Sequence, residues 1–393
     1  INTCGFIESA KEESIDTIIE NVKKKSNGRL KKVYAMGCLS ERYRVDLEKE
    51  IPEVDRFFGS HHMQEVLKEL GADYKYELLG ERMLSTPNHY AYLKISEGCD
   101  NPCSFCAIPL MRGKHVSRSM EEIKAEAELL AEKGVREIVV IGQDTTYYGL
   151  DRYGRRRLSE LLETIADVQG IEWVRLMYTY PAKFPPDVLD VIANHPHVCK
   201  YIDIPLQHVS DEVLKSMRRG TSHRALKDLI ARIREKVPGI AMRTTLIVGY
   251  PNETTSAFDE VLGFVEETRF DRLGVFTYSL EDGTTAYPLG DPIPRNEKER
   301  RRALVMELQK AVSETNNELL IGTRQKVLID RVEGEYFIGR TERDAPEIDN
   351  EVFVETKRQL RPGSFCEVEI VDASEYDLYG CTTRVFTDLN MPQ

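Results

Sequence analysis

The chain has 393 residues, of which 41% are hydrophobic and 31% charged, so it is long and apolar enough for two or three globular domains and is not a disordered protein. Lys and Arg total 54 against 66 Asp and Glu, and the formal charge of -12 disfavours a general polyanion binder. No membrane-length apolar stretch or signal-like start is visible and the eight cysteines suit a reducing compartment, so we expect no membrane partner and a cytoplasmic location.

The first 80 residues predict a small α/β domain. Apolar strands and polar helices alternate there, over Glu12–Lys25, Lys32–Met36, Val45–Glu50 and Met63–Leu70. The chain opens at Ile1 inside a predicted strand that leads to Cys4, without an initiator Met, so we expect the natural protein to extend further at its N-terminus. The polar segment Leu79–Asn88 contains Pro87 and is typical of a linker.

Residues 81–321 predict a parallel sheet curled into a partial (β/α)6 barrel. Six apolar strands are expected, over Tyr90–Ile95, Glu137–Ile141, Trp173–Tyr178, Tyr201–Ile204, Met242–Val248 and Leu273–Tyr278. Near-continuous apolar strands with intervening helices are typical of a sheet covered on both faces. The run from Ser119 to Glu122 has the capping-box pattern of a helix start. In such barrels chemistry gathers at the carboxyl ends of the strands.

A CxxxCxxC motif formed by Cys99, Cys103 and Cys106 follows the first of these strands. Three thiolates on one loop can hold three corners of a 4Fe-4S cluster, which leaves one iron open for a small molecule. Zinc is the alternative, but structural zinc sites prefer paired CxxC units or Cys/His mixtures, and the chain contains no second CxxC. The spacing therefore favours a catalytic iron-sulfur cluster.

From Gln325 the hydrophobic period changes to two. Short strands are expected over Val327–Ile329, Tyr336–Ile338, Val352–Val354 and Val368–Val371, and Gly and Pro turns between them predict a small antiparallel barrel. Residues 322–393 contain nine Lys and Arg against fifteen Asp and Glu, a net charge of -6. This sign disfavours RNA binding and suits docking to a basic protein.

The chain resembles the radical S-adenosylmethionine (SAM) methylthiotransferases over essentially its whole length. The CxxxCxxC loop carries the resemblance together with Cys4 in NTCGF, Cys38 in GCLSERY, and the segments PLQH, MRR, TLIVGYPNE and YSLEDGT. The resemblance implies a methylthiotransferase domain at residues 1–80, a radical SAM core at 81–321 and a TRAM domain at 322–393. TRAM domains commonly bind RNA, but the acidic charge of this one favours a protein partner.

Two 4Fe-4S clusters and SAM are the cofactors that the resemblance implies. Cys99, Cys103 and Cys106 would hold the cluster that cleaves SAM to a radical. Cys4 and Cys38 would hold two corners of the cluster that carries the sulfur, and because nothing here matches the further cysteine of the family, we expect that third ligand to be absent from this chain. An electron donor protein is a further expected partner.

Three residues at strand ends are candidates for contact with SAM. Gln143 and Asp144 follow the second barrel strand, where related enzymes contact the methionine portion, although they can equally structure the turn. Gly249 would let the backbone approach the adenine closely, or would serve only a strand-to-loop bend.

Other polar residues receive structural interpretations. For His208 the alternatives are a side chain that faces the substrate and a hydrogen-bonded structural residue, and the second is preferred because it is the more common role of a lone His at a strand end. The basic run Lys298–Arg302 is interpreted as the solvated face of a helix. Cys199, Cys366 and Cys381 lack partners at metal-ligand spacing and are interpreted as buried small apolar residues.

The family resemblance implies addition of a methylthio group to the β-carbon of an aspartate in small-subunit ribosomal protein S-twelve. The alternative is the branch that methylthiolates an isopentenylated adenosine in tRNA. The acidic C-terminal barrel, the segment Asp344 to Asp349 and Glu281-Asp282, where the tRNA branch tends to carry Arg-Pro, favour the protein substrate. A rival of another class is a non-catalytic iron-sulfur or RNA-binding module.

Overall fold

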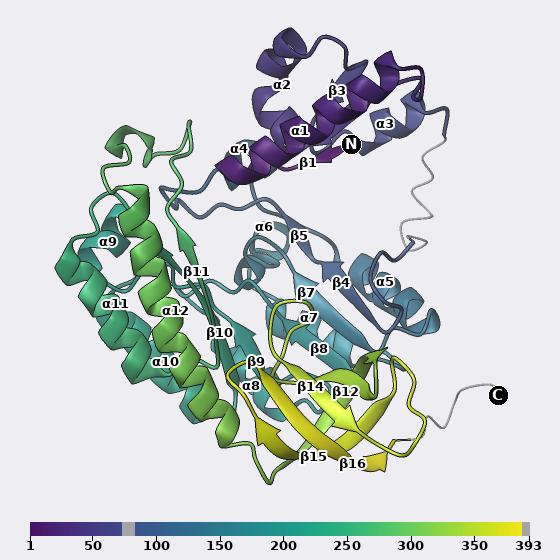
Figure 1. Cartoon of the computed structure of the whole chain (residues 1–393), viewed down its shortest axis with the longest axis vertical. Coiled ribbons are helices and arrows are strands. Elements are labelled where there is room, and N and C mark those ends of the chain that lie inside the picture. Colours follow the sequence, from purple (N-terminus) through teal and green to yellow (C-terminus); the bar gives the residue numbers. More distant parts are fainter. Residues whose placement is uncertain (73–82, 387–393) are drawn as a thin grey trace. The chain divides into compact units, whose positions relative to one another are not determined.

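The computed structural model describes residues 1–72 and 83–386 (Figure 1). The chain forms two compact units. The first, called the cysteine unit below, comprises Ile1–Leu79, Glu97–Val116 and Ser279–Pro292, and the second, the barrel unit, comprises Gly80–Ser96, Ser117–Tyr278 and Ile293–Gln393. Across the described residues, no helix combines the length and the apolar character that crossing a membrane requires. The predicted domain limits stay predictions, and the predicted linker lies partly outside the described residues.

A small parallel sheet organises the cysteine unit. Its strands are β1 (Asn2–Thr3), β2 (Tyr34–Gly37) and β3 (Arg56–Phe58), paired in that order. Its helices are α1 (Glu8–Ser26), α2 (Cys38–Glu50), α3 (Met63–Glu69) and α4 (Ile108–Arg112). Ile18 of α1 and Leu39 and Leu47 of α2 pack against Ala35 and Phe57 of the sheet. The predicted α/β character is confirmed, while β3 went unpredicted because three residues show no periodicity.

The barrel unit contains the six expected parallel strands with nearly the expected ends. They are β4 (Tyr90–Lys94), β7 (Glu137–Ile141), β8 (Trp173–Leu176), β9 (Tyr201–Asp203), β10 (Ala241–Val248) and β11 (Arg272–Thr277). These form the sheets β4-β7-β8 and β9-β10-β11. A parallel bridge between Val174 and Val198 and a 3.0 Å hydrogen bond from Thr179 N to Asp203 O join the two sheets into a partial barrel.

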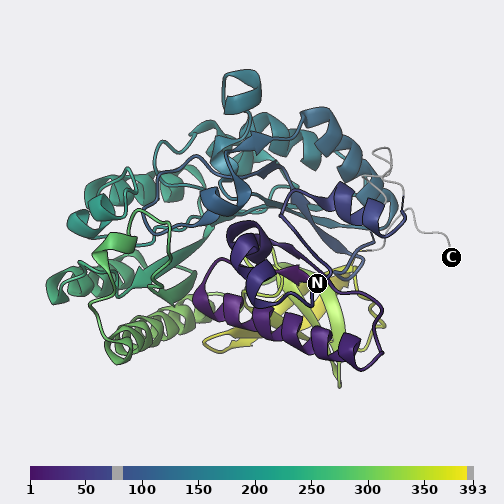
Figure 2. The same cartoon turned by 90° about the horizontal axis from the view of Figure 1, so that it is seen from above.

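Helices cover the outer face of this curved sheet (Figure 2). They are α5 (Met120–Glu132), α7 (Leu158–Ala166), α8 (Asp187–Asn194), α9 (Asp211–Ser216), α10 (His223–Lys236), α11 (Thr255–Thr268) and α12 (Arg295–Glu318). The short helix α6 (Leu150–Tyr153), in the connection between β7 and α7, has no buried residue. Ile138 and Val140 of β7 pack in the core that these helices share, and Val139 between them packs inside the barrel. The capping box at Ser119 is confirmed, because its side chain and that of Glu122 each accept from the other's backbone N–H. The strands β5 (Ser96–Glu97) and β6 (Val116–Ser117) pair with each other.

A closed barrel of five strands ends the chain. Its strands are β12 (Arg324–Glu333), β13 (Tyr336–Thr341), β14 (Glu351–Glu355), β15 (Phe365–Ala373) and β16 (Asp377–Val385), in the order β12-β13-β14-β16-β15. The four expected strands are confirmed. β16 was not expected, and its parallel pairing with β14 closes the barrel within an otherwise antiparallel arrangement.

Buried ion pairs join this five-stranded barrel to the amino end of the six-stranded one. Glu137, the first residue of β7, accepts a hydrogen bond from Arg175 Nε at 2.8 Å, and its Oε2 forms an ion pair with Arg340 Nη1 of β13 at 2.8 Å. The side chains of Glu137 and Arg175 are fully buried, and that of Arg340 is 3% exposed. Arg340 Nε also donates to Asp330 Oδ2 at 2.7 Å. The amino end of the strands is therefore closed, and the carboxyl ends are left for chemistry.

The acidic segment from Asp344 to Asp349 contributes carboxylates to this junction. Arg272 Nε of β11 donates to Asp344 Oδ1 at 2.9 Å, and the Asp344 side chain is 1% exposed. Arg243 Nε of β10 donates to Asp349 Oδ1 at 3.3 Å, and Tyr201 Oη donates to Asp349 Oδ2 at 2.7 Å. Two carboxylates of the segment are thus used inside the molecule, so the net charge overstates the acidity of its surface.

Glu137→Gln tests the buried junction. We expect the free energy of unfolding to fall by about 3–5 kcal/mol, because the amide leaves two buried guanidinium groups without their shared counter-charge. Denaturant titration measures the loss. Arg331→Met is the matched control, since its pair with Glu351 is exposed and should contribute less than about 1 kcal/mol. Equal losses in the two variants would contradict the junction's role.

Candidate functional site

The loop that carries Cys99, Cys103 and Cys106 is closed by its own backbone. Cys99 N donates to Gly113 O at 3.2 Å, and His115 N donates to Asp100 Oδ1 at 3.1 Å, so the outgoing and returning arms are tied together. A Cβ at Gly98 would lie 2.1 Å from Lys114 O, and only glycine permits that approach. Cys106 N donates to Cys103 O at 3.2 Å, which makes a tight turn between the last two cysteines.

The donor set of this loop fits an iron-sulfur cluster. All three thiols are half-buried, and Asn101 Nδ2 lies 3.4 Å from Cys99 Sγ, a contact of the kind that tunes cluster sulfurs. Within residues 1–72 and 83–386 no group of three or more His, Cys, Asp or Glu side chains is placed to hold a metal ion. Thiolates around a four-iron cluster each bind a different iron, so they stand further apart than the ligands of a single ion.

Cys4 and Cys38 lie at neighbouring strand ends. Thr3 of β1 and Gly37 of β2 are register partners in a parallel pair, and each cysteine is the next residue along its strand. A Cβ at Gly37 would lie 2.5 Å from Thr3 O, and one at Gly5 would lie 2.8 Å from Leu39 N. These two glycines therefore let the segments around the cysteines approach closely.

Local contacts present both cysteines at one end of the sheet. Cys4 is exposed, and its backbone N and O both hydrogen-bond Ser14 Oγ, at 2.9 and 3.1 Å. Cys38 is half-buried and is the first residue of α2, where the helix N-terminus favours negative charge. α2 also contacts α4, the helix that follows Cys106 (Figure 1). The structure thus places all five predicted ligands in the cysteine unit.

Gln143 and Asp144 follow β7 at the carboxyl end of the barrel strands. Gln143 is half-buried. Asp144 is 2% exposed, and its carboxylate accepts from Thr146 N at 2.9 Å and from Thr146 Oγ1 at 2.6 Å. Asp144 therefore caps the short helix η2 (Thr145–Tyr147), and its carboxylate stabilises this turn.

Gly249 begins a tight turn after β10, with φ of +76°. Glu253 closes this turn, because its Oε2 accepts from Gly249 N at 2.5 Å and from Tyr250 N at 3.2 Å. A Cβ at Gly249 would lie 2.4 Å from Lys298 Cγ. The glycine is therefore required both for the bend and for the packing of a lysine stem.

Part of the basic run Lys298–Arg302 is buried, so its interpretation as a solvated face was wrong. Lys298 is 5% exposed and its Nζ donates to Tyr278 O at 2.8 Å. Arg301 is 6% exposed and its Nη1 donates to Glu253 Oε1 at 2.9 Å. A signal was present in the sequence, because these two residues share a helix face with Val305 at spacings of three and four.

His208 is a buried structural residue, as expected. Its Nδ1 accepts from Ser210 N at 3.1 Å, and its Nε2 lies 3.8 Å from Glu253 Oε2. Burial lowers the pKa of His208 to about 3, and the nearby Arg301 acts in the same direction. The imidazole is therefore neutral at physiological pH.

Two strand-end residues that sequence reasoning missed have left-handed backbones. Tyr178 after β8 has φ of +57°, and Gln207 after β9 has φ of +73°. Non-glycine residues in this region cost energy and concentrate at functional sites. The Tyr178 amide donates to the buried Asp203 at 3.0 Å, which fixes its conformation. Neither sequence position carries a local signal for this backbone shape.

The remaining cysteines divide by burial. Cys199 and Cys366 are fully buried, as expected, and burial raises the pKa of the Cys366 thiol to about 12. Cys381 is exposed on β16, so the expectation that it is buried was wrong. The alternating faces of a strand that was not predicted explain the error.

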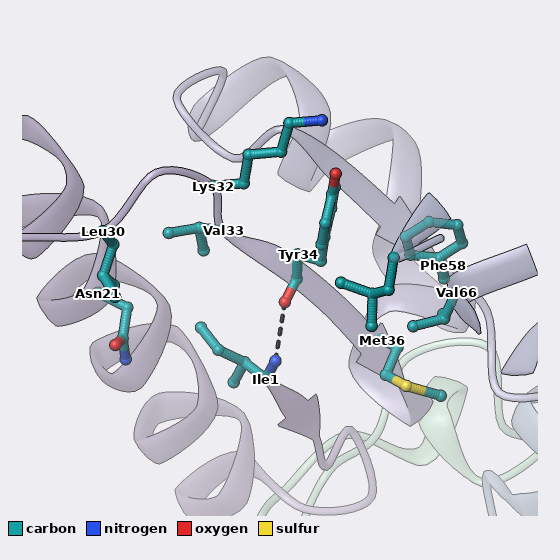
Figure 3. Close-up of a pocket in the computed structure, with 10 residues that line it drawn as sticks. Ile1, Asn21, Leu30, Lys32, Val33, Tyr34, Met36, Phe58 and Val66 are labelled. Carbon is teal, nitrogen blue, oxygen red and sulfur yellow. Dashed lines mark hydrogen bonds between the residues drawn. The ribbon is translucent and has the colours of Figure 1, made fainter. Parts of the chain in front are cut away.

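A cavity of about 270 Å³ opens in the cysteine unit beside the sheet (Figure 3). It is lined by Ile1, Asn21, Leu30, Lys32, Val33, Tyr34, Met36, Phe58, Val66 and Leu70. The lining is mostly apolar and includes none of the predicted ligands.

Arg301→Met tests the buried pair beneath the Gly249 turn. Burial raises the pKa of Glu253 even though Arg301 opposes the shift. A carboxyl with a raised folded-state pKa costs stability above that pKa, and the cost disappears below its unfolded pKa. We therefore expect a loss of about 3–5 kcal/mol at pH 8 that shrinks as the pH falls toward 4.5, measured by denaturant titration at each pH. Arg302→Met, at an exposed position, is the control, and a loss independent of pH would contradict the argument.

Three family models match successive parts of the chain. Residues 1–59 match "Uncharacterized protein family UPF0004", residues 93–265 match "Radical SAM superfamily" and residues 321–382 match "TRAM domain".

Solved structures with low sequence identity share the fold. The radical SAM methyltransferase TsrM from Kitasatospora setae, solved with tryptophan and a SAM analogue, has a TM-score of 0.53 at 14% identity, over 80% of this chain and 64% of its own. The cobalamin-dependent radical SAM enzyme OxsB has a TM-score of 0.50 at 13% identity, over 78% of this chain and 47% of its own.

Full-length relatives are much more similar. Ribosomal protein uS12 methylthiotransferase RimO of Cytophaga hutchinsonii is 58% identical over 97% of this chain and 87% of its own length. The RimO of Flavobacterium johnsoniae is 55% identical over the same shares. With this similarity across both units, the chain belongs to the RimO family of radical SAM methylthiotransferases.

Proposed function

We propose that this protein adds a methylthio group to the β-carbon of an aspartate in ribosomal protein uS12. Membership of the RimO family supports the reaction and the substrate. The observation that carries the proposal is the placement of Cys4 and Cys38 in the same compact unit as the CxxxCxxC loop. A reaction that first makes a carbon radical and then delivers sulfur to it needs both groups within reach of one substrate.

In this proposal Cys99, Cys103 and Cys106 hold the 4Fe-4S cluster that binds SAM. When bound, this group would supply the electron for reductive cleavage of SAM, and SAM would supply the radical that takes a hydrogen atom from the aspartate β-carbon. Gln143 and Gly249 are the candidate SAM contacts, and Asp144 orients Gln143 by fixing the turn that follows it.

Cys4 and Cys38 hold two corners of a second cluster that presents the sulfur. Their adjacent strand ends and the N-terminus of α2 support this role, because together they offer two thiols beside a region that favours negative charge. When bound, this cluster would supply the sulfur for a new carbon–sulfur bond in place of the broken C–H bond and would take up the one electron released as that bond forms, and a second SAM would supply the methyl group.

The partners follow from this chemistry. An electron donor protein supplies the electrons, and a reducing cytoplasm keeps the five thiols available as ligands. RNA is not a favoured partner, because residues 322–393 carry a net charge of -6 and stay net acidic when the buried Asp344, Asp349 and Arg340 are set aside. The alternative function is 2-methylthiolation of a tRNA adenosine, which the TRAM domain match keeps open.

Cysteine variants separate the two proposed clusters. Alanine at Cys99, Cys103 or Cys106 should abolish reductive SAM cleavage, because the cluster would lose a corner ligand. Alanine at Cys4 or Cys38 should preserve cleavage, lower the iron content from the parent's value toward the roughly four atoms of a single cluster, and abolish methylthiolation. Iron and sulfide analysis, 5′-deoxyadenosine release and the mass of uS12 measure the three effects.

Cys381→Ala is the matched control, because this exposed thiol is not a proposed ligand. It should keep iron content and activity. Full methylthiolation by Cys4→Ala would refute the second cluster, and undiminished SAM cleavage by Cys103→Ala would refute the first.

Parallel assays with two substrates decide between the branches. The reconstituted enzyme should shift the mass of uS12 by one methylthio substitution and leave isopentenylated tRNA unchanged, because the surface of its C-terminal barrel does not attract a polyanion. Methylthio-adenosine in the tRNA together with unmodified uS12 would establish the alternative function.

A further inference from the structure

The segment Ser279–Pro292, called the bridge below, contacts both cysteine-bearing parts of the cysteine unit. It follows β11, the last barrel strand, and contains the short helix η3 (Tyr287–Leu289). The proposed function assigns no role to any residue of the bridge. One half of the bridge contacts the CxxxCxxC loop, and the other half contacts the part that carries Cys4 and Cys38.

The second half of the bridge is fixed to the CxxxCxxC loop. Ala286 is fully buried, and its N donates to Ser104 O at 2.8 Å, between Cys103 and Cys106. Thr285 Oγ1 lies 3.4 Å from the same carbonyl oxygen. A backbone hydrogen bond to a residue inside the motif leaves little freedom between the bridge and the loop.

The first half of the bridge is fixed to the part that carries Cys4 and Cys38. Glu281 is 3% exposed, and its Oε2 accepts from Arg42 Nη1 at 2.9 Å and from Lys11 Nζ at 3.1 Å. Arg42 Nη2 donates to Asp282 O at 2.5 Å and to Asp282 Oδ1 at 2.7 Å. Two adjacent carboxylates of the bridge thus converge on one arginine.

Arg42 also reaches the residue next to Cys4. Its Nη1 donates to Gly5 O at 3.0 Å, its side chain is 5% exposed, and it lies on α2, the helix that begins at Cys38. A guanidinium group is planar and presents its donors in a fixed fork, so one group that bonds three partners fixes their mutual orientation. Arg42 therefore links both cysteine segments to the bridge.

We propose that Arg42 and Glu281 are positioning residues that set the separation between the Cys4/Cys38 pair and the CxxxCxxC loop. The inference rests on the proposed function, in which sulfur held at one set must reach a radical generated at the other. Misplacement by about 1 Å can cost a reaction about a hundredfold. Loss of the link should therefore uncouple SAM cleavage from sulfur insertion without preventing cleavage.

Conservative variants test the link. Glu281→Gln keeps the shape and removes the charge, and Arg42→Lys keeps the charge and removes the fork. In the reconstituted enzyme both should retain iron content and 5′-deoxyadenosine release within about twofold, while methylthiolated uS12 formed per 5′-deoxyadenosine falls about tenfold or more. Arg44→Lys is the matched control on the same helix, because its pair with Glu48 is exposed, and it should keep the parent's ratio.

A second measurement, made on the protein without clusters or SAM, tests the link independently of activity. Hydrogen–deuterium exchange of the unloaded chain should increase at residues 4–7 in both variants and stay unchanged at residues 99–106, because only the first side of the bridge is released. A parent-like product ratio in both variants would overturn the inference. So would a parallel loss of cleavage and product, since the defect would then lie in SAM cleavage. A parent enzyme that cleaves SAM but leaves uS12 unmodified would refute the proposed function itself and the inference with it.

Discussion

Buried pairs of arginine and carboxylate are the interaction on which the described architecture depends. Glu137 with Arg175 and Arg340 closes the amino end of the barrel, and Glu253 with Arg301 fixes the turn after β10. Such pairs gain little over apolar packing in stability, but they specify geometry, because a buried charge tolerates only the arrangement that satisfies it. In the cysteine unit, Arg42 and Glu281 form another buried pair of this kind, close to the proposed ligands.

Closure of one barrel end gives the C-terminal barrel a structural role. Asp344 and Asp349 are hydrogen-bonded to arginines of β11 and β10. The C-terminal barrel therefore helps to hold the six-stranded barrel together. Arg243 donates both to Asp349 and to Asp203, and Asp203 in turn accepts from the Tyr178 amide at a strand's carboxyl end. The two ends of the barrel are thereby connected through a single chain of polar contacts.

Sequence patterns predicted the features that depend on interactions between residues close together in the chain. The six barrel strands and the capping box at Ser119 were found because burial on both faces and helix capping leave signatures within a few residues. The CxxxCxxC motif was found for the same reason. The helical spacing of Lys298, Arg301 and Val305 indicated a shared face, but the ion pair that lets Arg301 be buried was not visible because Glu253 lies 48 positions away. The adjacency of Cys4 and Cys38 depends on a parallel register that spacing does not show.

The order of strands in the C-terminal barrel has a consequence for synthesis on the ribosome. β16 follows the other four strands of this barrel in sequence, yet it lies between β14 and β15, so the barrel cannot close until residue 385 has emerged. Non-local pairings of this kind form late, after the chain segments that they join are complete. The amino end of the larger barrel is therefore closed only after residue 385 has emerged, and until then the arginines that line it are exposed to solvent in the nascent chain.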